Sequence, residues 1–202
     1  MFGILRILVG SLLGILVFVL VLKFVKIQSN RRFILILIIF LLITVLGFVP
    51  FENLVYSFKS AEEVYEYYYL SEKDVELVVE GKQSDFVVGR KNEVSTFLIV
   101  PKTSNGWKIG ISLNTKKIVE KFYDGITVYI YQYKNTNDYF VTVFDIHGRK
   151  LNISDDYNTK FFLSKYDNDF LGKPFHTYYA FVSDYNQQFS ITVNGNKINL
   201  GQ

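Results

Sequence analysis

Residues 126–133 read ITVYIYQY, and this stretch decides the fold class of the chain. Successive side chains of a β-strand point to opposite faces. Val128 and Ile130 then share one face, and the opposite face presents the tyrosines Tyr129, Tyr131 and Tyr133. The tyrosines are either a half-buried ladder of cross-strand pairs above a core that holds Val128 and Ile130, or an aromatic face that stacks sugars or a peptide. We favour the ladder as the simpler interpretation.

Short runs of the same kind surround this strand, and turn residues separate them. Asn-Gly and Asp-Gly supply the positive φ angles that tight hairpin turns require, and they occur at 105–106, 124–125 and 194–195. The clearest hairpin covers residues 189–200. Because no helical period lies between the runs, the spacing predicts an antiparallel β-sandwich or barrel over residues 71–202. The predicted strands are residues 75–80, 85–89, 95–101, 107–112, 126–133, 139–145, 160–163, 175–183, 189–193 and 197–200.

The first fifty residues have a different composition. Residues 2–22 contain one charge, Arg6, and residues 33–50 contain none. Each stretch covers roughly 27–30 Å as a helix, close to the thickness of a hydrocarbon core. Residues 1–50 are therefore predicted to be a transmembrane helical hairpin, with spans 2–22 and 33–50 joined by a connector at 23–32. A cleaved signal peptide is the alternative for the first span, but the apolar run is too long and no small-residue cleavage site follows it.

Basic residues set the orientation of such a hairpin, because Lys and Arg gather on the cytoplasmic side of a membrane. The connector contains four of them, Lys23, Lys26, Arg31 and Arg32. The opposite side has Arg6 and, beyond the second span, Lys59. We therefore expect the connector in the cytoplasm and the C-terminal domain outside it, with the chain anchored in the cell membrane by two spans.

Two glycines four residues apart lie in the first predicted span, Gly10 and Gly14. Such a pair lets two membrane helices approach closely. The partner is either the first span of a second copy or the second span of the same chain. The short connector always keeps the second span nearby, so we favour packing within the chain.

Residues 51–70 form a predicted juxtamembrane tether that ends in a short helix. Ser60 and Glu63 are spaced as in a capping box, where the hydroxyl caps a backbone N–H and the carboxylate reaches back. A helix is therefore expected from about residue 61 to residue 70. No long Gly, Ser or Pro linker separates the predicted spans from the domain, so the domain is expected to stay near the bilayer surface.

The charges divide unevenly along the chain. The sequence has 22 basic and 19 acidic residues, a net charge of +3, and a mean hydropathy of +0.18. All five charges of the first fifty residues are basic, so the remainder is slightly acidic. That balance disfavours nucleic acid as a partner, because phosphate binding needs clustered cations. The absence of cysteine excludes disulfides, thiol nucleophiles and zinc–thiolate sites.

Motifs for catalysis, cofactors or resident metals are not found, so no catalytic, cofactor-binding or metal-ligating residue is assigned. The two histidines, His147 and His176, belong to no ligand or nucleophile spacing. Residues 167–172 begin like a calcium loop but fail at its fifth and twelfth positions. A looser calcium site is the remaining option there, and it would draw on Asp155, Asp156, Asp167 and Asp169.

Four segments look familiar together: FENLVYSFKSAEEVYEYY at 51–68, PKTSNGWKIG at 101–110, YQYKNTNDYFV at 131–141 and TVNGNKINL at 192–200. They resemble an uncharacterised group of small membrane-anchored β-domain proteins of low-GC Gram-positive bacteria. The resemblance implies that this order of segments is a recurring module. It implies no activity, cofactor or catalytic residue.

These observations favour a membrane-anchored extracytoplasmic binding or interaction module, or an accessory membrane protein. Its expected partners are the lipid bilayer and a protein or cell-wall component, with no nucleic acid. One alternative is a cell-surface enzyme acting on wall glycans, which would need carboxylates such as Asp155, Asp167 or Glu80 beside the tyrosines. The other is a small accessory subunit of a membrane transporter, in which the helices would be the functional part.

Overall fold

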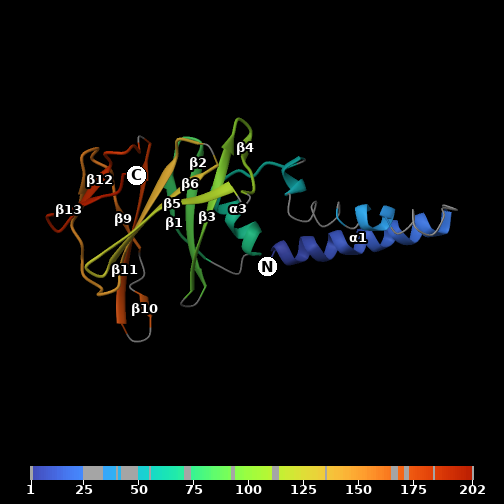
Figure 1. The fold of residues 1–202 in the computed structure, drawn as a ribbon, viewed down its shortest axis with the longest axis horizontal. Coiled ribbons are helices and arrows are strands. Elements are labelled where there is room, and N and C mark those ends of the chain that lie inside the picture. The colour runs from blue at the N-terminus through green and yellow to red at the C-terminus, as the bar shows by residue number, and fades with distance from the viewer. Residues whose placement is uncertain are drawn as a thin grey trace.

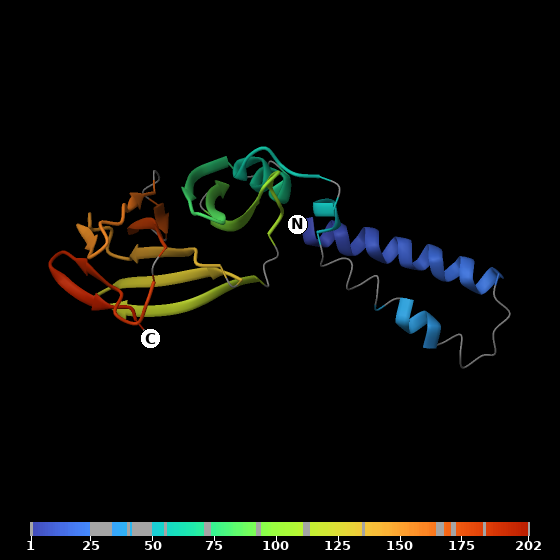
Figure 2. The same ribbon diagram turned by 90° about the horizontal axis from the view of Figure 1, so that it is seen from above.

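The structure is a computed structural model of the chain. It describes residues 2–24, 34–39, 41, 50–54, 56–70, 74–91, 94–110, 114–134, 136–164, 168–170, 173–183 and 185–201. A long helix, α1 (Phe2–Phe24), extends from one end of a body of antiparallel strands. Figures 1 and 2 both show the C-terminal strands at the end of the molecule farthest from α1. The fold is mainly β, as the sequence predicts.

The predicted spans are covered only in part. Of α1, the side chains of residues 10–21 and 23 are described, and of the second span residues 34–39 and 41 are helical. Within the described residues, no helix meets both the length and the apolarity of a membrane span. The transmembrane hairpin therefore stays a prediction. Among the orientation residues, Lys23 is exposed at the end of α1, whereas Lys26, Arg31 and Arg32 lie outside the described residues.

A single-turn helix, η1 (Phe51–Leu54), leads to the predicted short helix, α3 (Ala61–Tyr69). The Ser60 hydroxyl accepts a hydrogen bond from the backbone N–H of Glu63 at 3.3 Å, as expected for the cap. The Glu63 carboxylate reaches back to the backbone N–H of Lys59, one residue before the cap, at 2.8 Å. Leu70 ends the helix in the left-handed region, with φ of 55°.

The first sheet has the order β1-β2-β3-β4 and is antiparallel throughout. Its strands are β1 (Asp74–Glu80), β2 (Ser84–Lys91), β3 (Val94–Thr103) and β4 (Gly106–Trp107). Helix α3 covers one face, where Val64 and Tyr65 pack against Val87 and Val100. The alternate residues of β2 and β3 point away from the helix, so this sheet has a second buried face.

The central sheet has the order β10-β11-β7-β6-β5. In addition, β9 pairs with Tyr178 and Tyr179 of β11. A smaller sheet has the order β13-β12-β8. The strands of the central sheet are β5 (Thr115–Tyr123), β6 (Ile126–Tyr133), β7 (Tyr139–Asp145), β9 (Phe162–Leu163), β10 (Asn168–Phe170) and β11 (Lys173–Val182). Those of the smaller sheet are β8 (Ile153–Asp155), β12 (Ser190–Val193) and β13 (Asn196–Asn199).

The central sheet has a buried core on each face. One core joins the even-numbered side chains of β6 to the smaller sheet, and it includes Val128, Ile130 and Ile191. The other core joins Phe140 and Tyr179 of the central sheet to Phe86 and other side chains of the first sheet. Val128 and Ile130 are thus core residues, as the ladder interpretation of β6 requires.

A buried carboxylate connects the first sheet to the central sheet. Asp138, which is 0% exposed, lies just before β7 and accepts hydrogen bonds from the backbone N–H groups of Lys82, Gln83 and Ser84 at 3.2, 2.6 and 2.7 Å. The Ser84 hydroxyl donates a fourth, at 3.0 Å. One side chain therefore fixes the β1–β2 turn against the β6–β7 connection.

Candidate functional site

The tyrosine face of β6 continues across the neighbouring strands. In the register of the central sheet, Tyr129 lies opposite Thr142 of β7, and Thr142 lies opposite Tyr179 of β11. The next row along is Tyr131, Phe140 and Phe181. Residues directly opposite in antiparallel strands share a face. The result is a floor of aromatic rings interrupted by one threonine.

A cavity of about 320 Å³ lies on this floor, and β3 of the first sheet forms its wall. That volume is at the lower end of the range for small-molecule sites. Its aromatic lining residues are Phe97, Tyr129, Tyr131, Phe144, Phe175 and Tyr179. Its other lining residues all bear hydroxyl groups: Ser95, Thr96, Thr142 and Thr177. The lining is therefore amphipathic, and its described residues include no carboxylate, amine, guanidinium or imidazole.

A second cavity of about 360 Å³ adjoins the first. Its lining includes Tyr68 and Tyr69 of α3 and Lys117 of β5, and it shares Phe97 and Tyr131 with the first cavity. The rings of Phe97 and Tyr131 have centroids 4.8 Å apart and an interplanar angle of 47°. Phe97 stays 39% exposed, although its ring stacks on the buried ring of Phe86 at 4.9 Å. One aromatic pair thus separates two cavities. We call the two cavities together the aromatic cleft.

The hydroxyl groups of the cleft differ in how they are satisfied. The Thr96 hydroxyl lies 2.6 Å from the Tyr65 hydroxyl of α3. The Thr142 Oγ1 is buried, and no hydrogen-bond partner is found for it among the described residues. A buried hydroxyl without a partner costs free energy, and the Thr142 side chain is part of the lining of the first cavity.

The charged groups at the rim of the cleft are a lysine and a glutamate that pair with each other. Lys117 forms an ion pair with Glu120 on the exposed surface of β5, and its ammonium lies 5.4 Å from the centroid of the Tyr129 ring. The hydrogen bond that the Lys117 ammonium donates to the Glu120 carboxylate raises the pKa of Lys117. Burial raises the pKa of Tyr131, and the neighbouring Tyr129 adds to the effect. The Tyr131 hydroxyl is therefore a neutral hydrogen-bond donor at physiological pH.

The same burial predicts an alkaline limit to stability. Burial raises the pKa of Tyr65 to about 12, against 10.0 for a free tyrosine, and burial also raises the pKa of Tyr179. A raised folded-state pKa contributes stability that is complete below the unfolded pKa and is lost as the pH rises through the folded pKa. The urea concentration at the unfolding midpoint should therefore decrease as the pH is raised from 10 to about 12. Over the same pH interval, the urea midpoint of Tyr65→Phe should decrease by less than that of the parent chain. Equal losses in the variant and the parent chain would contradict this prediction.

The residues predicted from sequence are only partly brought together. Tyr129 and Tyr131 line the cleft, whereas Tyr133 is 9% exposed and its hydroxyl lies 3.4 Å from the Asn114 side-chain amide, outside both cavities. Sequence reasoning did not find Phe97, Thr142 or Tyr179. Each of these residues lies in a strand whose side chains alternate between two faces as expected. The sequence pattern does not show which strands meet at the cleft, because the pairing and packing of the sheets determine that. In α1, Gly14 is buried and Gly10 is half-buried.

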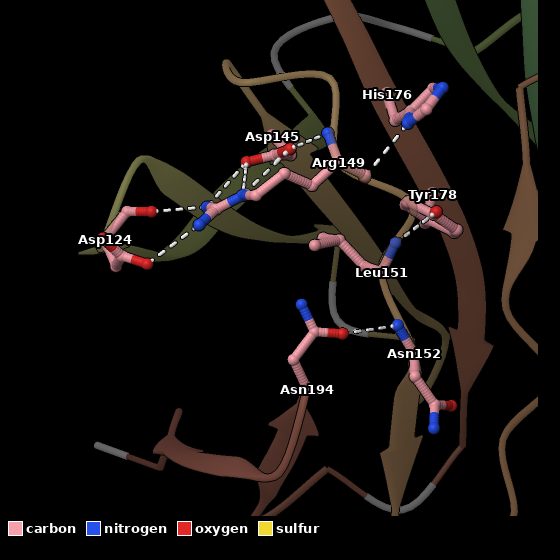
Figure 3. A network of polar contacts seen from close by, with 8 residues as sticks. All are labelled: Asp124, Asp145, Arg149, Leu151, Asn152, His176, Tyr178 and Asn194. Carbon is pink, nitrogen blue, oxygen red and sulfur yellow. Dashed lines mark hydrogen bonds and ion pairs between the residues drawn. The ribbon is translucent and has the colours of Figure 1, made fainter.

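Figure 3 shows the polar network in which Arg149 and His176 lie. The Arg149 guanidinium donates to the buried carboxylate of Asp145 at 2.9 Å and to the exposed carboxylate of Asp124 at 2.9 Å. These two carboxylates raise the pKa of Arg149. His176 contacts the Arg149 carbonyl through Nδ1 at 3.0 Å, and His147 lies against Gly125. The network joins the β5–β6 turn to the chain after β7, and its contacts are those of a structural element.

Among the described residues, the acidic side chains considered for a looser calcium site do not form a ligand set. The Asp155 carboxylate accepts from the backbone N–H groups of Tyr157 and Thr159 at 3.1 and 2.8 Å, which closes a turn. Asp156 faces Lys197 at 3.8 Å. Asp167 lies outside the described residues, and for Asp169 the backbone alone is described.

Comparison with known proteins adds no further assignment. No protein-family model, no curated protein and no solved structure matches the chain. The resemblance to small membrane-anchored β-domain proteins therefore rests on the four sequence segments alone.

Proposed function

We propose that this protein is a membrane-anchored binding module that presents the aromatic cleft outside the cytoplasm. The observation that carries this proposal is the pair of adjoining cavities, about 320 and 360 Å³, which share the Phe97–Tyr131 wall. Pockets for small molecules are concave and largely apolar, with a few placed polar groups. The cleft has this composition.

Exposed apolar side chains support the membrane anchor. Leu12, Leu13, Ile15 and Leu16 of α1 each expose more than half of their surface. These positions point in different directions around the helix, so no single protein face could cover them. A helix that is apolar all round is suited to lipid, and the two long apolar stretches of the sequence, with Arg6 as their one charge, agree with this.

The lining of the cleft favours binding over hydrolysis. Most enzymes that hydrolyse glycosides use a pair of carboxylates beside the substrate. Among the described residues that line the two cavities there is no carboxylate. Glu76, a buried acid of the first sheet, is hydrogen-bonded to Ser164 instead.

The orientation can be tested by cysteine labelling, because the chain contains no cysteine. Single cysteines at Ser29 and Asn105 should react differently with a membrane-impermeant maleimide applied to intact cells. We expect labelling at position 105 and none at position 29, and labelling of both positions after the cells are lysed. Labelling at 29 but not at 105 in intact cells would overturn the extracytoplasmic placement.

Binding at the cleft can be tested without knowing the ligand. A photoreactive benzoylphenylalanine at Phe97 would face the cleft, whereas the same group at Tyr157, an exposed aromatic position elsewhere on the β domain, serves as the control. Irradiation of cells should give a covalent adduct of defined mass at position 97 that the control lacks. Identical adduct patterns at both positions would overturn the binding function.

A further inference from the structure

We propose that the aromatic cleft binds a neutral oligosaccharide. This inference rests on the proposed binding function and names the class of ligand. It draws on four properties of the described lining residues: the ring faces, the hydroxyl groups, the lack of unpaired charge, and the division of the cleft into two cavities.

The rings match the apolar faces of sugars. A pyranose ring presents C–H groups on its faces and hydroxyl groups around its edge, and aromatic side chains combine a broad apolar face with, in tyrosine, a polar tip. Tyr129 and Tyr131 have ring centroids 6.1 Å apart with an interplanar angle of 32°. Neighbouring rings at this spacing offer stacking surfaces to successive sugar units.

The polar groups of the first cavity match the edges of sugars. Apart from the tyrosine tips, its polar side chains are the hydroxyls of one serine and three threonines. A hydroxyl both donates and accepts hydrogen bonds, as each sugar hydroxyl does. The buried Thr142 Oγ1, for which the described residues offer no partner, would gain one from the ligand.

The charges favour a neutral ligand. The first cavity has no ionised side chain among its described lining residues, so a phosphate or carboxylate group would lose its hydration there without gaining a counter-charge. The second cavity has Lys117, but this ammonium is already paired with Glu120.

The two cavities favour a chain of sugars over a single sugar. Because Phe97 and Tyr131 belong to both linings, a ligand that crosses this pair contacts the first cavity on one side and Tyr68 and Tyr69 on the other. A monosaccharide would fill one cavity and leave the other to water.

Calorimetric titration of the full chain tests this proposal. The chain should be held in a detergent without a sugar headgroup, because a glycosidic detergent would compete for the cleft. The probes are N-acetylglucosamine and glucose, each with its β-1,4-linked oligomers of increasing length. We expect the affinity for at least one series to rise with chain length and then level off.

Four variants locate the site. Tyr129→Ala should weaken binding by about tenfold or more, since it removes a stacking surface worth roughly 1.4 kcal/mol or more. Tyr129→Phe should keep most of the affinity, and Tyr123→Ala, an exposed tyrosine at the far end of β5, should keep all of it. Thr142→Val should weaken binding without lowering the thermal midpoint, because it replaces a buried hydroxyl by a methyl group of the same shape. That variant keeps the test decisive if Tyr129→Ala folds poorly.

The outcomes separate the ligand class from the binding function. The absence of saccharide binding, an affinity that does not depend on chain length, or equal affinity in Thr142→Val and the parent chain would each overturn the saccharide assignment. Tighter binding of polygalacturonate oligomers would overturn its neutrality. Binding of a decaproline peptide in place of saccharides would overturn it too, because extended proline-rich chains also dock in aromatic grooves. The binding function itself would survive these results if the adduct at position 97 forms.

Discussion

Replacing Asp138 by alanine is expected to destabilise the protein by roughly 3–5 kcal/mol, which would unfold much of a marginally stable domain. The carboxylate is fully buried and accepts three backbone N–H groups and one hydroxyl. Without it, these donors of the β1–β2 turn lose their acceptor in a buried place where little water can replace it. Urea unfolding at neutral pH, followed by circular dichroism, measures the change.

Two controls distinguish this effect from a general sensitivity of the β6–β7 connection. Asp138→Asn should still destabilise the protein, because it places an amide NH₂ group where N–H donors converge. The loss should be smaller than in Asp138→Ala, because asparagine keeps one acceptor oxygen. Asn137→Ala, at the neighbouring exposed residue, should change stability by no more than about 0.5 kcal/mol. If Asp138→Ala unfolds at the same urea concentration as the parent chain, the carboxylate does not hold the two sheets together.

The second large effect is expected at Gly89 of β2. A Cβ atom there would lie 2.4 Å from the Tyr65 hydroxyl oxygen and 2.5 Å from two ring carbons. Tyr65 is wholly buried in the core between α3 and the first sheet, so its ring cannot move aside without lifting the helix. Gly89→Ala should therefore cost about 3 kcal/mol through overpacking.

The same variant should reach the cleft, because α3 supplies Tyr68 and Tyr69 to the second cavity. The double variant Gly89→Ala with Tyr65→Leu tests the cause, since leucine removes the ring that the new methyl group meets. The double variant should lose less stability than the sum of the losses in the two single variants. Urea unfolding of the parent chain, both single variants and the double variant measures this coupling energy. Strict additivity would show that the cost at Gly89 does not come from Tyr65.

Strands with a buried face were predictable from the sequence, and strands without one were not. Residues 126–133 and 139–145 coincide with β6 and β7, because alternating β-branched and aromatic residues reflect a sheet with a core on either side. β5 was missed because it is an edge strand, in which four of nine residues are charged and Val119 is the one buried residue. The short strands β8 and β10 were also missed.

One predicted strand was largely wrong for a different reason. Of residues 107–110, the part of this prediction that the structure describes, Trp107 alone is assigned to a strand. The Lys108 ammonium donates to the backbone carbonyls of Asn53 and Tyr56, and the Asn53 side chain accepts from the backbone N–H of Ile109 at 2.9 Å. The apolar pattern there reflects packing against the segment that follows the predicted spans, a tertiary contact that local periodicity does not contain.

The cleft was predictable in its chemistry and not in its extent. The alternation of β6 identified Tyr129 and Tyr131 as an aromatic face, and it also included Tyr133, which is buried in the same core but lies outside both cavities. The opposite wall comes from Phe97, which is far away in the sequence and reaches the tyrosines because the first sheet lies over the central one. Single-strand periodicity gives the face of a residue, but not which strand of another sheet lies above it.

The pairing of β11 with β7 has a consequence for how quickly the protein reaches its native state. The β1–β2, β2–β3, β5–β6 and β6–β7 pairs are hairpins of neighbouring segments, whereas β11 joins β7 only after the chain has passed through β8, β9 and β10. Closing so long a loop costs more configurational entropy than closing a hairpin. We therefore expect the hairpins to form early, and the docking of β11, which brings Thr177 and Tyr179 to the cleft, to limit the folding rate.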